Sequence, residues 1–65
     1  MIHIKSSRDL IEVLLTHGWT LNRTRGSHRV YTHPSKGGHL TVPHPKKDLG
    51  QGLVKSILKQ AGISE

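Results

Sequence analysis

The chain must build its whole fold from 65 residues, and it contains no cysteine. A chain of this length buries only about 60% of the surface that its unfolded form exposes, so it supports one small hydrophobic core. Without cysteine, neither a disulfide nor a thiolate metal site can reinforce that core. We therefore expect a single domain over residues 1–65, with its functional residues on the surface or in a shallow groove.

The charge of the chain indicates what kind of partner it has. Ten Lys and Arg residues face four Asp and Glu residues, which gives a formal net charge of +6. Such an excess in a short chain favours a polyanionic partner, either nucleic acid or a strongly acidic protein. No segment resembles a signal peptide or reaches the roughly 20 apolar residues of a membrane span. Together with the missing cysteines, this predicts a cytoplasmic protein without membrane contact.

The hydrophobic pattern changes its period twice along the chain. Apolar residues at helical spacing predict a helix over 7–17 and a last helix that ends before Gly62. Between them, the alternation typical of strands predicts strands over 19–23, 28–33 and 39–42. Gly50 and Gly52 weaken the first turn of that last helix. The order predicts an α+β domain in which both helices cover one face of a three-stranded antiparallel sheet. Double-stranded-RNA-binding domains share this order.

RNA cleavage requires few groups, and histidine suits it because imidazole exchanges protons near neutral pH. His28 follows a turn at the start of the second strand, and a glycine, a serine and three arginines lie within a few residues of it. These neighbours, which we expect to contact RNA, are Arg23, Arg25, Gly26, Ser27 and Arg29. His28 is therefore a candidate for proton transfer. The alternative is a hydrogen-bonded histidine at the rim of the core.

The orientation of His28 depends on strand alternation. His28 shares a face with Val30, so if Val30 packs under the helices, Arg29 and Tyr31 face away from them. A register that joins Val30 to Val42 would place His28 opposite His44.

Other basic residues are weaker candidates. His44 is either a second proton carrier or an RNA contact in its loop, and Lys46 and Lys47 follow it closely enough to contact phosphates. We expect His33, His39 and Lys36 near the second turn to lie in solvent. The histidines lack the spacing of a zinc site, so we predict no metal and no cofactor.

Three segments of the chain resemble the HicA toxins. They are Gly26–Tyr31 with its G-S-H sequence, the strand end Thr41–His44, and the terminal helix over 56–64. The resemblance spans nearly the whole chain, in order. Many relatives carry a second histidine where this chain has Pro45, and a threonine where it has Gly52.

The resemblance implies a fold of the double-stranded-RNA-binding type and a ribosome-independent mRNA interferase with His28 as its catalytic residue. It also implies a HicB-type antitoxin as partner, with any contact to DNA made only through that antitoxin. The alternatives are a non-catalytic RNA-binding module of the same fold and a protein that only docks an acidic partner.

Overall fold

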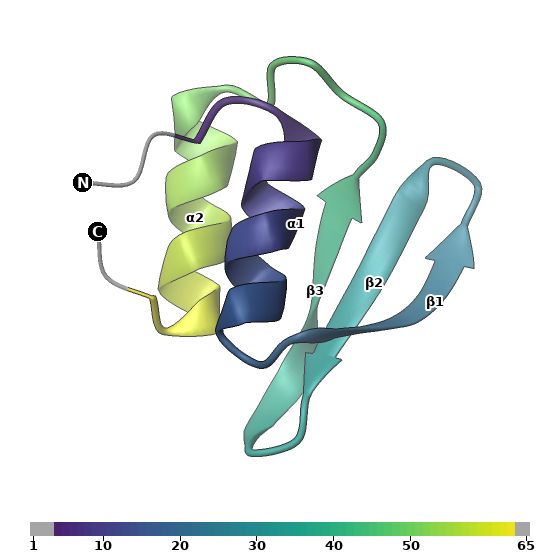
Figure 1. Cartoon of the computed structure of the whole chain (residues 1–65), viewed down its shortest axis with the longest axis vertical. Helices are drawn as coiled ribbons and strands as arrows, with labels where there is room; N and C mark the ends of the chain where they lie inside the picture. Colours follow the sequence, from purple (N-terminus) through teal and green to yellow (C-terminus); the bar gives the residue numbers. More distant parts are fainter. Residues whose placement is uncertain (1–3, 64–65) are drawn as a thin grey trace.

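The computed structural model describes residues 4–63, and Ser64 at the end of the terminal motif lies outside them. The elements are α1 (Ser7–Thr16), β1 (Thr20–Arg25), β2 (His28–His33), β3 (Lys36–Pro43) and α2 (Gln51–Ala61). The strands form one antiparallel sheet in the order β1-β2-β3. The α-β-β-β-α order of an α+β domain is therefore confirmed (Figure 1).

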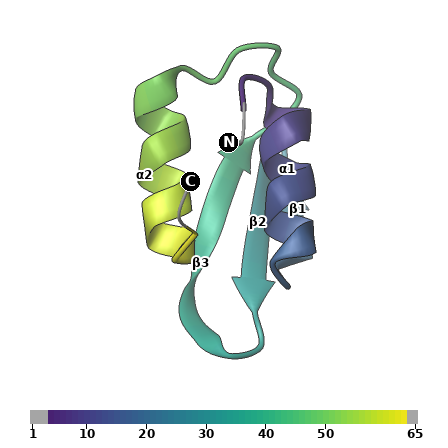
Figure 2. The same ribbon diagram turned by 60° about the vertical axis from the view of Figure 1, so that its left-hand side comes forward.

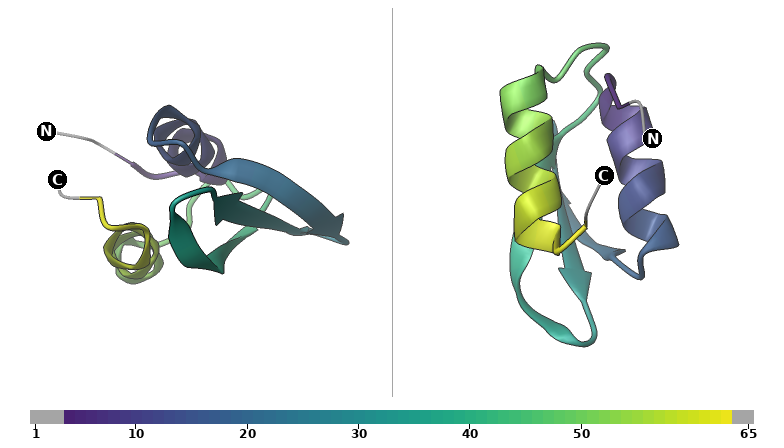
Figure 3. Two further views of the ribbon diagram at one scale, coloured as in Figure 1. Left: turned by 90° about the horizontal axis from the view of Figure 1, so that it is seen from below. Right: turned by 90° about the vertical axis from the view of Figure 1, so that its left-hand side faces the viewer.

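The two helices lie side by side on one face of the sheet, and the core fills the space between these layers (Figures 2 and 3). The helices contribute Leu10 and Leu14 of α1 and an apolar stripe of α2, and the sheet contributes Tyr31, Leu40 and Val42. Trp19, just before β1, is 1% exposed and belongs to this core, as its size predicts. Within residues 4–63, no helix covers the opposite face of the sheet.

The alternation of β2 is the reverse of the one considered from the sequence. Tyr31, not Val30, packs under the helices, and it pairs with the core residue Leu40. Val30 therefore faces the open side, where it pairs with Thr41 rather than Val42. His28 pairs with Pro43, one position away from the expected His44. An aromatic ring buries more apolar area than valine, and this favours the observed orientation.

A β-bulge in β1 sets which of its side chains share a face with those of β2. Leu21 pairs with Tyr31, but the register then shifts, so that Arg23 pairs with Val30 and Arg25 with His28. Without the extra residue, Leu21 and both arginines would share one face. The bulge therefore turns the arginines to the open side of the sheet while Leu21 stays on the side of the helices.

Both hairpin turns are shorter than the sequence indicates, because β1 continues to Arg25 and β3 begins at Lys36. The first turn has only two residues, Gly26 and Ser27, and the positive φ of 58° falls on the glycine. A positive φ at the first central position alone is the pattern of a type II′ turn, which suits the twist of paired strands. Gly26 thus fixes where His28 begins the second strand.

Two side chains connect the second hairpin to the helices: His33, which is half-buried rather than fully in solvent, and Lys36, which is exposed as expected. The ring of His33 lies 5.2 Å from that of Trp19, and its Nε2 contacts the His17 carbonyl at 3.1 Å. Lys36 donates a hydrogen bond of 2.7 Å from its ammonium to the Ala61 carbonyl at the end of α2. A cation suits this position because helix carbonyls at the C-terminus carry partial negative charge.

The buried Ser7 joins α1 to the loop that follows β3. Its hydroxyl lies 2.7 Å from Nδ1 of His44 and accepts a 2.8 Å hydrogen bond from the Lys46 amide. The Ser7 amide in turn donates to the Lys46 carbonyl at 2.9 Å. Ser6, rather than Ser7, caps the helix, through a capping box with Asp9. Ser7 is thus free to hold the loop.

We expect Ser7→Ala to lower the free energy of unfolding by about 1–3 kcal/mol, because it leaves buried polar groups without their partner. Chemical denaturation measures the loss. Ser35→Ala, in the exposed second turn, is the matched control and should change stability by less than about 0.5 kcal/mol. Equal stability of the two variants would show that the Ser7 contacts contribute nothing to folding.

Candidate active site

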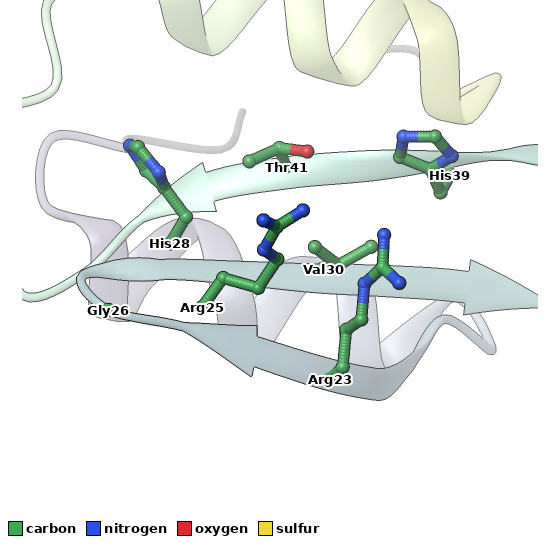
Figure 4. A pocket seen from close by; sticks show the side chains of 7 residues that line it. All are labelled: Arg23, Arg25, Gly26, His28, Val30, His39 and Thr41. Carbon is green, nitrogen blue, oxygen red and sulfur yellow. The ribbon is translucent and has the colours of Figure 1, made fainter.

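A groove crosses the open face of the sheet and draws on all three strands. Its lining residues are Arg23, Arg25, Gly26, His28, Val30, His39 and Thr41. The groove has a volume of about 570 Å³ and is open to solvent. It therefore combines two guanidinium groups, two imidazole rings and a hydroxyl above a floor that Val30 partly forms (Figure 4).

His28 stands at one end of this groove with its side chain exposed. It pairs with Arg25 on β1, and in Figure 4 the Arg25 side chain runs into the middle of the groove while the His28 ring lies at its end. The backbone on the other side is held by a 2.7 Å hydrogen bond from the His44 amide to the Ser27 carbonyl. An exposed imidazole on a braced strand end, in a groove that also holds guanidinium groups, is an arrangement that can transfer a proton at a phosphate.

Arg29 does not join this groove. It pairs with Val42, so it faces the side of the helices and is half-buried. Burial raises the pKa of the Tyr31 hydroxyl, and the neighbouring Arg29 guanidinium partly offsets that rise. Arg29 therefore stands beside a core tyrosine, on the face opposite the one that carries His28.

The remaining predicted contacts lie in a second hollow at the start of α1. Its lining includes His44, Lys46 and Lys47 together with Arg8 and Pro45. His44 is half-buried and bonded to Ser7, so its ring supports the loop. Lys46 and Lys47 are exposed. The structure thus places part of the predicted set in the groove with His28 and part in this hollow, while Ser27 and Arg29 line neither.

His39 and Thr41 also belong to the groove, although neither was predicted there from the sequence. Both lie on β3 and alternate with the buried Leu40 and Val42. The period of two that identifies Leu40 and Val42 as core residues also places positions 39 and 41 on the other face. The alternation of β3 could therefore have identified both residues, but only with knowledge of which face of the sheet the helices cover.

The groove carries positive and neutral groups, and no carboxylate lies in its lining. Over residues 4–63, no group of three or more His, Cys, Asp or Glu side chains is arranged to hold a metal ion. The groove therefore attracts anions.

Between residues 4 and 63, no helix is long and apolar enough to cross a membrane.

Comparison with protein families gives an independent result. The family model described as the HicA toxin of bacterial toxin–antitoxin systems matches residues 7–63. A search of curated proteins found no match. The family match covers both helices and all three strands. The chain therefore belongs to the HicA toxin family of bacterial toxin–antitoxin systems.

Proposed function

We propose that this toxin is a ribosome-independent endoribonuclease that cleaves mRNA in the cytoplasm, with His28 as its catalytic residue. The observation that carries the proposal is the exposed His28 imidazole at the end of a groove that also holds Arg25 and Arg23. Membership of the toxin family supports a harmful activity, and the positive groove supports a polyanionic substrate. We propose that residues 1–65 form one toxin domain.

The chemistry needs a proton acceptor, a proton donor and stabilisation of charge. The ribose 2′-hydroxyl loses its proton and attacks the adjacent phosphorus, while the bond to the 5′ oxygen breaks and that oxygen gains a proton. His28 performs one of these proton transfers, and solvent in the open groove serves the other. Arg25, paired with His28 across the strands, stabilises the charge on the phosphate. The products are a 2′,3′-cyclic phosphate and a 5′-hydroxyl.

The residues outside the groove have secondary parts in this proposal. Ser27 in the turn beside His28 and the exposed Lys46 and Lys47 add contacts to RNA at the same end of the sheet. Arg29 and His44 contribute by supporting Tyr31 and the loop, since each has its own partner in the fold.

We expect His28→Ala to lower the rate of RNA cleavage by about 10²–10⁴-fold, because a proton-transfer group is lost. The fold should persist, since the side chain is exposed. Cleavage of a labelled RNA without ribosomes measures the rate, and circular dichroism checks folding.

The control is His17→Ala, which removes an exposed histidine outside the groove and should cleave normally. A folded His28→Ala protein with full activity would exclude His28. RNA binding without cleavage by the unaltered protein would favour the non-catalytic RNA-binding module.

Cleavage should continue unchanged in EDTA and leave a cyclic phosphate. Two arginines in the lining repel a divalent cation, and no carboxylate there can hold one. Mass spectrometry of the products and a rate measured with and without the chelator test this prediction. Loss of cleavage in EDTA that returns with added Mg²⁺ or Mn²⁺ would overturn the metal-free mechanism.

The family implies an antitoxin partner. We propose a HicB-type antitoxin that covers the groove and makes any contact with DNA itself. An acidic partner suits the positive surface, because complementary charge speeds encounter. Since the chain has no cysteine, the reactivity of a single introduced cysteine shows directly whether the antitoxin covers that position.

In a His28→Ala background, a cysteine at Thr41→Cys should react with a maleimide in the free toxin and be protected in the complex. The exposed Gln60→Cys on α2 is the matched control and should react in both states. If the complex forms and Thr41→Cys still reacts at its free rate, the antitoxin does not act by covering the groove.

A further inference from the structure

The groove has two positively charged ends. His28 and Arg25 form one end, and they are paired across β1 and β2. One step along the same face, Arg23, Val30 and Thr41 form a row across all three strands. His39 lies beyond Thr41 on β3 and completes the far end with Arg23. Figure 4 shows His28 and His39 at opposite ends of the groove, with the Arg25 guanidinium and Val30 between them.

The spacing of these rows matches an RNA backbone. Residues two apart on a strand are separated by about 6.5 Å, which is close to the distance between successive phosphates in an extended nucleic-acid strand. A phosphate held at His28 and Arg25 therefore has its neighbour near the row that contains Arg23. His39 is a further two positions along β3, within reach of the same phosphate or its ribose.

The width of the groove favours a single strand. The outer strands of a three-stranded sheet lie about 10 Å apart, and the groove is confined between side chains of β1 and β3. A duplex is wider than this space, whereas one sugar–phosphate chain fits it. The far end offers a guanidinium fork, an imidazole and the Thr41 hydroxyl, which suit phosphate oxygens. No Phe, Tyr or Trp side chain lies in the lining to stack on a base.

We propose that Arg23 and His39 form a second phosphate-binding subsite, which holds the phosphate next to the scissile one in single-stranded RNA. The inference rests on the proposed cleavage at His28, because the scissile phosphate defines the register. Arg23 and His39 are positioning residues that place the substrate and take no part in proton transfer. The toxin accordingly recognises the backbone of at least two consecutive nucleotides.

Binding to an RNA oligonucleotide in which one 2′-deoxy nucleotide blocks cleavage tests the subsite. Arg23→Gln and His39→Ala should each weaken binding by about tenfold, the typical loss of a hydrogen bond to a charged group. In the unaltered protein, a neutral methylphosphonate beside the blocked position should cause a similar loss. The methylphosphonate is placed on the 5′ side in one oligonucleotide and on the 3′ side in another, and the side that responds gives the direction of the strand.

The decisive comparison combines the two changes. The variants should lose no further affinity when the neighbouring phosphate is neutral, because that contact is already absent. Lys55→Gln removes one charge from an exposed position on α2 and should stay as sensitive to the methylphosphonate as the unaltered protein. On a cleavable RNA, Arg23→Gln and His39→Ala should lower kcat/KM by about tenfold, mainly through a higher KM, as expected for residues that bind the substrate but transfer no proton.

The outcomes separate this inference from the proposed function. Failure of the unaltered protein to cleave any RNA overturns the endoribonuclease. If cleavage occurs but neither methylphosphonate weakens binding, or if the variants remain as sensitive as Lys55→Gln, the second subsite is excluded while cleavage at His28 stands. A large loss of the saturated rate in His39→Ala would instead assign His39 to the chemistry and overturn its positioning role.

Discussion

The packing of Tyr31 in the core is the interaction on which the rest of this domain depends. Its ring is 2% exposed and packs with Leu40 and Val42 beneath the two helices. Because successive side chains of a strand point to opposite faces, this one choice turns His28 and Val30 to the other side of the sheet. A shift of one residue would place His28 under the helices and bring Val30 into the core. The open groove therefore exists because an aromatic residue outweighs valine in a core this small.

The bulge in β1 completes what the alternation of β2 begins. It lets Leu21 pair with Tyr31 and yet places Arg23 and Arg25 opposite Val30 and His28. Like charges gathered on one face repel one another, but water screens them because both arginines are exposed. The same residues in a buried site would cost more than this core could offset. An open, shallow groove is thus the form in which so short a chain can present several cations to an anion.

Much of the fold and the centre of the site follow from the sequence. Helical and alternating apolar spacing predicts the five elements, and the context of His28 predicts the groove end where Arg25 also lies. The face of the sheet could not be derived, because Val30 and Tyr31 are both plausible core residues on adjacent positions of one strand. That single ambiguity accounts for the omission of His39 and Thr41. Arg29 was expected beside His28 only because the two are adjacent in sequence, although adjacent side chains of a strand face opposite sides of the sheet. The roles of His33 and Lys36 depend on contacts with Trp19 and Ala61 that lie far away in the sequence.

The hydrogen bonds of His44 also explain how the backbone near His28 is held in place. His44 is committed to Ser7 through its ring, while its amide holds the carbonyl of Ser27 in the turn before His28. The start of α1, the loop after β3 and the first hairpin turn are therefore linked by consecutive hydrogen bonds. A site carried on strands and braced in this way is more rigid than one carried on free loops. The orientation of His28 is consequently coupled to the Ser7 junction, so a change that loosens this small core also loosens the geometry of the groove.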